Sequence, residues 1–208
     1  MNILEFYYEK VIKHDLINKF YYLNIKNIPK LEKIVLNFGC NSHNIKKLAA
    51  AILALELISL KKGKLSSSKN SNIFLKIRKG APTGCYVILK KKKMYSFLFK
   101  LLVEIFPNLK NFKGIPNNKD YGNNNNSFSF YIEDLISLKE LNNHFYIFNN
   151  LPSLNITIIS NSSKKKELIY LLKSFKIPLQ SSKSAIVTQL VECNLAKIKV
   201  KGSNPFYC

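Results

Sequence analysis

Ammonium groups are the most abundant chemically active side chains in this sequence. Lys and Arg number 33 against 12 Asp and Glu, which gives a formal net charge of +21, and Arg78 is the single arginine. Lysine offers a point charge without the planar fork of arginine, so attraction to phosphate should outweigh bidentate reading of base edges. Nucleic acid carries enough fixed negative charge to match such a surface, which favours it over an anionic membrane face or an acidic protein.

The basic side chains gather around one excursion of the chain between two apolar segments. They are Lys61, Lys62, Lys64, Lys69, Lys76, Arg78 and Lys79, followed by the four lysines at 90–93. Together they could meet a phosphate backbone; the alternative is a solvated charged face, which the net charge of the whole chain disfavours. Tyr86, Tyr121 and Phe128 could stack on bases, and the alternative is that they belong to the core.

Residue patterns typical of catalysis or metal binding are missing. His14, His43 and His144 lie in different segments, and GAPTGC at 80–85 lacks the Lys-Ser/Thr end of a phosphate-binding loop. The four cysteines, at 40, 85, 193 and 208, are too far apart for a zinc motif, so we interpret them as buried reduced thiols. The sequence therefore predicts a protein that is not an enzyme and that uses no metal or cofactor.

The periodicity predicts one main domain over residues 1–180. Helical spacing is predicted over 3–22, 44–60, 95–106 and 162–175, and strands over 30–39, 73–77, 85–90, 128–132 and 154–159. The polar segment 61–72 is predicted to be a loop or hairpin tip. Because the elements are interspersed without strict βαβ repetition, we expect an α+β fold, with a mostly antiparallel sheet, helices on one face and the other face exposed.

The ends of the chain and its apolar runs argue against a membrane protein. The runs at 48–60 and 94–106 are too short to span a bilayer, and the first ten residues lack signal-peptide or transit-peptide character. Residues 181–208 differ in composition from the rest and are expected to be a C-terminal extension. Their last nine residues, VKGSNPFYC, suggest translation into a neighbouring tRNA gene, a hypothesis that a coding sequence without such an overlap would exclude.

Four ordered motifs make the chain resemble a known family. They are IPKLEKIVLNFG at 28–39, KIRKGAPTGCYVIL at 76–89, FPNLKNFKGI at 106–115 and LNITII at 154–159. In order and spacing they are similar to the universal large-subunit ribosomal protein number five, over residues 1–180. The resemblance implies a structural role in the large subunit, with an exposed sheet face that binds 5S rRNA and central-protuberance rRNA. It also implies a hairpin that reaches peptidyl-site tRNA and a contact with a small-subunit head protein at an intersubunit bridge.

The resemblance and the basic clusters together select candidate residues. The expected rRNA-binding residues are Lys30, Lys33, Asn37, Lys61, Lys62, Lys64, Lys90 and Lys92. The expected tRNA-facing loop comprises Ser67, Ser68, Lys69, Asn70, Ser71, Lys76 and Arg78. Asn37 occupies the family's contact position, and its amide can both donate and accept. Lys61, Ile88 and Lys90 stand where the family usually carries Gln, Thr and Arg.

Codon bias points to the genome of origin. Heavy use of Lys, Asn and Ile fits A- and T-rich codons, as in an organelle or a reduced bacterium. We therefore expect an organelle-encoded protein of the mitochondrial ribosome, in the matrix, in preference to one from a plastid or a bacterial cytoplasm. The alternative function is a free-standing basic RNA-binding module or ribosome-assembly factor.

Overall fold

A five-stranded antiparallel sheet forms the centre of the molecule. The computed structural model describes residues 3–40, 45–74, 77–109, 112–116, 126–135 and 138–180. The strand order is β2-β3-β1-β5-β4, and every neighbouring pair is antiparallel. The strands are β1 (Leu31–Gly39), β2 (Lys64–Ser67), β3 (Pro82–Lys90), β4 (Ser127–Ile132) and β5 (Leu154–Ser160). The sheet confirms the antiparallel arrangement that the sequence predicts.

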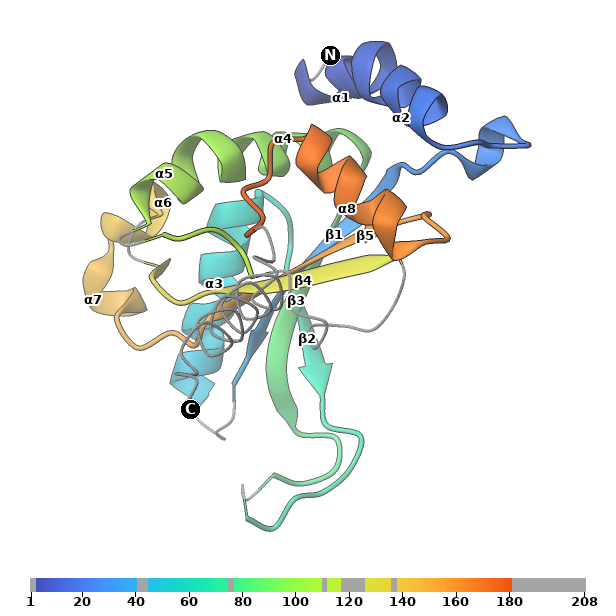
Figure 1. The fold of residues 1–208 in the computed structure, drawn as a ribbon. Coiled ribbons are helices and arrows are strands. Elements are labelled where there is room, and N and C mark those ends of the chain that lie inside the picture. The colour runs from blue at the N-terminus through green and yellow to red at the C-terminus, as the bar shows by residue number, and fades with distance from the viewer. Residues whose placement is uncertain are drawn as a thin grey trace, which may run out of the picture.

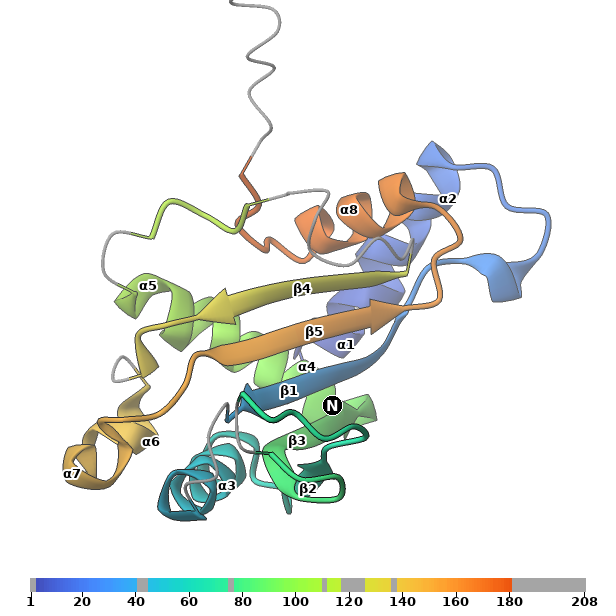
Figure 2. The same cartoon turned by 90° about the horizontal axis from the view of Figure 1, so that it is seen from below.

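Helices pack against one face of this sheet and leave the other uncovered, which confirms the α+β class. The larger ones are α3 (Ile45–Ser59), α4 (Lys91–Lys100), which a π-helical turn η3 (Leu101–Ile105) and α5 (Phe106–Asn108) continue, and α8 (Lys165–Ser174). Helix α3 contacts β3, and α4 contacts both β1 and β3. Seen from below, the strands lie in front of α4 and α8 (Figure 1, Figure 2).

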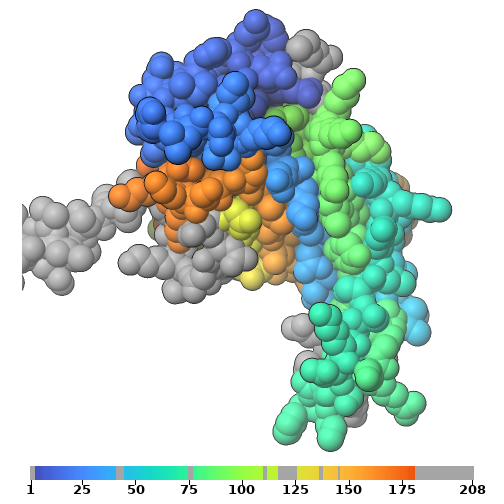
Figure 3. All heavy atoms as spheres, turned by 90° about the vertical axis from the view of Figure 1, so that its right-hand side faces the viewer, coloured from blue at the N-terminus to red at the C-terminus, as the bar shows by residue number. Residues whose placement is uncertain are grey.

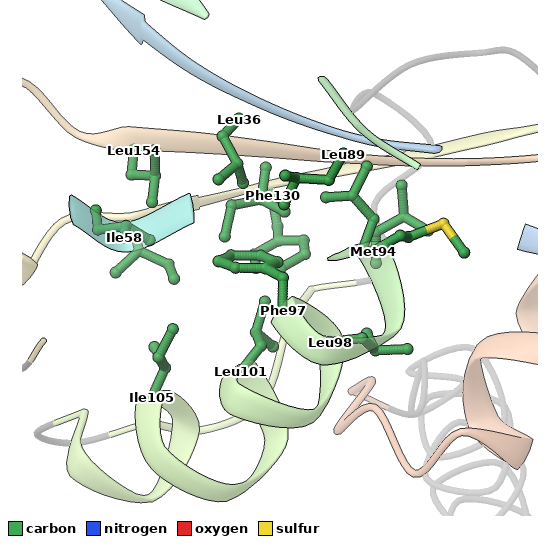
Figure 4. Packing of buried hydrophobic residues seen from close by; sticks show 14 of the residues in the cluster. Leu36, Ile58, Leu89, Met94, Phe97, Leu98, Leu101, Ile105, Phe130 and Leu154 are labelled. Atoms are coloured by element: carbon green, nitrogen blue, oxygen red, sulfur yellow. The ribbon is translucent and has the colours of Figure 1, made fainter. Parts of the chain in front are cut away.

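The core lies between the sheet and these helices. Alternation along the strands points Leu36, Leu89 and Leu154 to the helical side, where Phe97 and Leu101 pack against them (Figure 4). All five side chains are at least nine-tenths buried. Removing this apolar surface from water is the main force that holds the helices on the sheet.

The N-terminal segment is helical and packs across α4. It consists of α1 (Ile3–Tyr7), the π-helical turn η1 (Tyr8–Ile12) and α2 (Lys13–Lys19), followed by the short 3-10 turn η2 (Ile25–Asn27). The ring of Tyr8 stacks on Phe175, and its hydroxyl donates to the carbonyl of Pro29 at 2.9 Å. The predicted helix is therefore confirmed, although it ends at Lys19 because Phe20 adopts an extended conformation.

Several predicted boundaries are wrong. The strand predicted over 73–77 is not found: Ile73 and Phe74 lie in a turn, and β3 begins at Pro82. The third helix begins at Lys91 rather than Tyr95 and continues past Pro107 to Asn108, because a proline in the final turn removes few helical hydrogen bonds.

Other segments were not anticipated or are not described. The strand β2 and the short helices α6 (Lys139–Asn142) and α7 (Phe145–Phe148) have no counterpart in the sequence-based expectations. The C-terminal segment 181–208 lies outside the described residues, so its expected status as an extension stays a prediction. Within the described part of the chain, helices reach neither the length nor the hydropathy needed to cross a bilayer.

Candidate nucleic-acid interface

Polar and aromatic side chains form a cross-strand row on the uncovered face. Its members sit directly opposite one another, from one edge of the sheet to the other: Lys64, Tyr86, Asn37, Asn155 and Tyr131, on β2, β3, β1, β5 and β4. Opposed residues of antiparallel strands project to the same face. The structure thus places Asn37 at the centre of a row that combines one ammonium group, two amides and two phenol rings.

The amide of Asn155 in this row has hydrogen-bonding capacity to spare. Its side-chain oxygen is buried and has no donor among the described residues. Leaving such an acceptor unpaired costs about 1–3 kcal/mol, so a ligand hydroxyl or amino group that reaches it would be favoured. The 2′-hydroxyl of RNA can both donate and accept, and it is a suitable partner for an amide at this depth.

A flatter apolar row lies beside the first one on the same face. Ile88, Val35, Thr157 and Ser129 are aligned across the sheet, and the Ser129 and Thr157 hydroxyls are hydrogen-bonded to each other at 3.0 Å. Beyond this row, Lys33 of β1 faces Lys90 of β3. The face therefore changes from amide and aromatic groups, through a half-buried apolar floor, to cationic groups.

Lysines concentrate at the end of the sheet where β3 turns into α4. Lys61 donates from Nζ to the Ile88 carbonyl at 2.6 Å, and Lys93 donates from Nζ to the Leu60 carbonyl at 3.1 Å. Both hydrogen bonds hold ammonium groups close to this corner. Helix α4 also begins with three lysines and has no acidic residue in its first turn. Positive charge at a helix N-terminus adds to the macrodipole, so the corner attracts anions.

The structure brings most of the expected rRNA-binding residues together. Lys33, Asn37, Lys64 and Lys90 share the uncovered face, as the strand register shows. The others surround this face at its margins: Lys30 immediately before β1, Lys61 and Lys62 immediately before β2, and Lys92 in the first turn of α4. Their contact with RNA stays a prediction.

The expected tRNA-facing residues occupy a hairpin that projects from the sheet (Figure 1, Figure 3). Beyond the paired part of β2 and β3, the Ser68 amide donates to the Ala81 carbonyl at 2.9 Å, and the Gly80 amide donates to the Ser68 carbonyl at 3.0 Å. The side chains of Lys69, Asn70, Ser71 and Arg78 are exposed, as is Ser67, whereas Ser68 is half-buried. Lys76 lies outside the described residues.

The expected stacking aromatics have different outcomes. Tyr86 lies on the uncovered face, but Phe128 is buried in the core, so its interpretation as a stacking residue is wrong and the alternative is confirmed. Tyr121 lies outside the described residues. The sequence analysis missed Asn155 and Tyr131, although the alternation within LNITII and FSFYI would have placed both on the face opposite the core.

The remaining titratable groups do not suggest chemistry at this surface. Burial raises the pKa of the Cys40 thiol and raises that of Cys85 to about 12, so both stay protonated and unreactive at neutral pH. Burial likewise raises the pKa of Tyr8, Tyr22 and Tyr95 to about 12. Within the described ranges, His, Cys, Asp and Glu side chains nowhere gather in threes that could hold a metal ion.

An α+β fold with one uncovered sheet face, a lysine-rich margin and a basic projecting hairpin defines a binding protein for a polyanion. Comparison with known proteins narrows this class. Residues 82–179 match the family model for the C-terminus of ribosomal protein uL5. The large ribosomal subunit protein uL5m of Reclinomonas americana is 37% identical over 183 residues, which cover 86% of this chain and 98% of that protein.

Bacterial proteins are similar to nearly the same degree. The large ribosomal subunit protein uL5 of Desulforapulum autotrophicum is 35% identical, with 87% of this chain and all of that protein covered. That of Borreliella afzelii is 34% identical, with 86% and 97% covered. The chain belongs to the uL5 family of large-subunit ribosomal proteins. It is therefore a structural protein of translation rather than an enzyme, and its partners are rRNA and other ribosomal proteins.

Proposed function

We propose that residues 1–180 of this chain bind 5S rRNA and neighbouring central-protuberance rRNA through the uncovered sheet face. The observation that carries this proposal is the cross-strand row centred on Asn37. It places two amides between two tyrosine rings, which suits sugar hydroxyls and base edges. The lysines at the margin of the face neutralise phosphates and supply most of the affinity.

The proposal gives each group on this face a separate task. Lys33, Lys90 and Lys92 provide long-range attraction, which is independent of sequence and sensitive to salt. Asn37 and Asn155 provide short-range hydrogen bonds, which need a defined RNA backbone geometry. The half-buried floor that includes Val35 and Ile88 excludes water beneath a ribose or base.

We further propose that the β2–β3 hairpin contacts peptidyl-site tRNA. Its support is the projection of the hairpin from the sheet and the complete absence of acidic residues between Glu56 and Glu104. A small-subunit head protein at an intersubunit bridge completes the set of proposed partners. For cellular location we propose the mitochondrial ribosome, on the basis of the composition and the similarity to uL5m.

Binding to a 5S rRNA transcript tests the assignment of the sheet face. Asn37→Ala should weaken binding about tenfold, which corresponds to a lost hydrogen-bond pair in a desolvated interface. Asn143→Ala is the matched control, because Asn143 is an exposed asparagine at the end of α6, away from the uncovered face. Equal affinities of the two variants would remove Asn37 from the interface.

Sedimentation separates a subunit component from an assembly factor. A component of the mature particle should stay with large subunits through a sucrose gradient at high salt. A free-standing RNA-binding module or assembly factor should leave the subunits already at low salt, because non-specific phosphate contacts weaken steeply as salt rises. Release at low salt would therefore contradict the proposed structural role.

A further inference from the structure

The tip of the β2–β3 hairpin has a defined geometry. Asn72 and Ile77 each donate a backbone amide to the other's carbonyl, both at 2.9 Å, and thereby close the tip. The Phe74 amide then donates to the side-chain oxygen of Asn72 at 3.0 Å. This side-chain-to-backbone bond is typical of an Asx-turn, which fixes the direction of the chain over two residues. Phe74 is thus held on an ordered turn.

This turn presents two large apolar side chains to solvent. Ile73 is 90% exposed and Phe74 is 97% exposed, the highest value for a large apolar side chain among the described residues. Neither contributes to the core, so the folding of the chain gains little from their apolar character. Adjacent exposed apolar residues at the end of a projecting element are typical of a contact surface.

The charges around the tip indicate the chemistry of the partner. Lys69, Arg78 and Lys79 are exposed on the two arms of the hairpin, and the sequence from Ser67 to Ala81 contains no Asp or Glu. An aromatic ring flanked by cations matches a single-stranded or looped nucleic acid, where bases stack on the ring and phosphates meet the cations. An anionic membrane offers similar charge, but the membership in a ribosomal family favours RNA.

We propose that Phe74 stacks on an unpaired or terminal base of a folded RNA, with Ile73 packed against its edge. This inference rests on the proposed contact between the hairpin and tRNA, and it specifies the kind of contact. The basic side chains bring the RNA backbone to the hairpin, and the ring supplies a sequence-tolerant platform for one base. The Asx-turn holds the ring in place before binding, so little conformational freedom is lost on contact.

The absence of tryptophan from the chain makes a direct test practical. Phe74→Trp introduces a single fluorophore at the tip, and stacking on a base should quench its emission. Tyr146→Trp is the matched control, because Tyr146 is 80% exposed on α7, away from the hairpin (Figure 1). The full chain is titrated with a folded tRNA transcript, and binding is followed in parallel by the anisotropy of a dye on the RNA.

We expect tRNA to quench the emission of the Phe74→Trp variant and to leave that of the Tyr146→Trp variant unchanged. Phe74→Ala and Phe74→Leu should each weaken binding about tenfold, as expected for one lost stacked base, whereas Phe74→Trp should bind as the native chain does. Full affinity of the Phe74→Leu variant would contradict stacking, because leucine keeps the apolar contact and lacks the ring.

The basic residues of the hairpin distinguish failure of this inference from failure of the tRNA contact itself. If the Lys69→Ala/Arg78→Ala double variant binds tRNA more weakly but Phe74→Trp emission stays unquenched, the hairpin binds by charge alone and stacking is contradicted. If the double variant binds normally as well, both stacking and the hairpin–tRNA contact are contradicted. A blue shift of Phe74→Trp emission with anionic phospholipid vesicles, without quenching by tRNA, would replace RNA by a membrane.

Discussion

Lys33 and Lys90 lie directly opposite each other on β1 and β3, at the cationic end of the uncovered sheet face. Like charges that oppose each other across strands destabilise a sheet. The isolated chain therefore carries a local cost that a bound phosphate would relieve, since an anion between the two ammonium groups is attracted to both. This relation leads to a trade-off between the stability of the free chain and its affinity for RNA.

Lys90→Gln should expose this trade-off. The variant keeps most of the side-chain length and removes one charge, so the free energy of unfolding should rise by about 0.5 kcal/mol at low salt. The gain should fade as added salt screens the pair. Urea denaturation at two salt concentrations measures it. Lys173→Gln on α8 is the control, and an equal gain there would show that only the net charge matters.

Lys90→Ala and Lys92→Ala should each weaken rRNA binding and reduce its salt dependence. Each lost phosphate contact should lower the slope of log affinity against log salt by roughly 0.9. Titrations of an rRNA fragment at several salt concentrations give the slope. Lys173→Ala, on the helical side of the molecule, should leave it unaltered; an unchanged slope for Lys90→Ala or Lys92→Ala would remove that lysine from the interface.

Gly84→Ala should destabilise the sheet at the base of the hairpin. A Cβ atom at this position would lie 2.7 Å from the Phe38 carbonyl oxygen and 2.9 Å from the Ser66 hydroxyl, so the β1–β3 pairing must shift. We expect a loss of about 1–3 kcal/mol in urea denaturation. Gly39 is its register partner and has open space around it, which makes Gly39→Ala a matched control with a change within about 0.5 kcal/mol. Similar losses at both positions would contradict the steric explanation.

The ion pair of Lys100 and Glu140 should make stability depend on pH. Burial alone would raise the pKa of Glu140, but its hydrogen bond to Lys100 and the charge of that lysine hold the pKa below the ordinary 4.5. The pair therefore stabilises the fold above pH 4.5, and this contribution is lost as the pH falls through the lowered pKa of the folded state.

Glu140→Gln tests this pH dependence. The variant should unfold more easily at pH 7, by about 0.5 kcal/mol because the pair is partly exposed to solvent, and should match the native chain at the acidic end. Thermal denaturation over a pH series measures the difference. Glu133→Gln, which replaces an exposed carboxylate, serves as the control. A deficit of Glu140→Gln that persists below the lowered pKa would contradict an electrostatic origin.

Local sequence patterns identified the sheet-forming segments with little ambiguity where one face had to be apolar. The alternation in 30–39, 128–132 and 154–159 corresponds to β1, β4 and β5, because a one-residue slip would move every apolar side chain to the wrong face. The pattern was less informative at the hairpin tip. Ile73 and Phe74 have strand-forming side chains, but they lie in a turn whose apolar residues are exposed.

The candidate site was harder to predict than the fold. The resemblance to a family selected Asn37, and its lysines could be found from charge alone. Asn155 and Tyr131 lie more than 90 residues further along the chain, and their relation to Asn37 depends on the strand order, in which β5 inserts between β1 and β4. Strand order is set by the packing of the whole core, which no local pattern contains.

The amino-acid sequence by itself determined the charge, the secondary elements and the side of each strand that faces the core, because these follow from composition and short-range periodicity. Tertiary structure alone decided which polar side chains share the uncovered face and where the hairpin tip presents Phe74. Those placements depend on pairings between distant segments, whose register is fixed only when the helices and the sheet bury their apolar faces together.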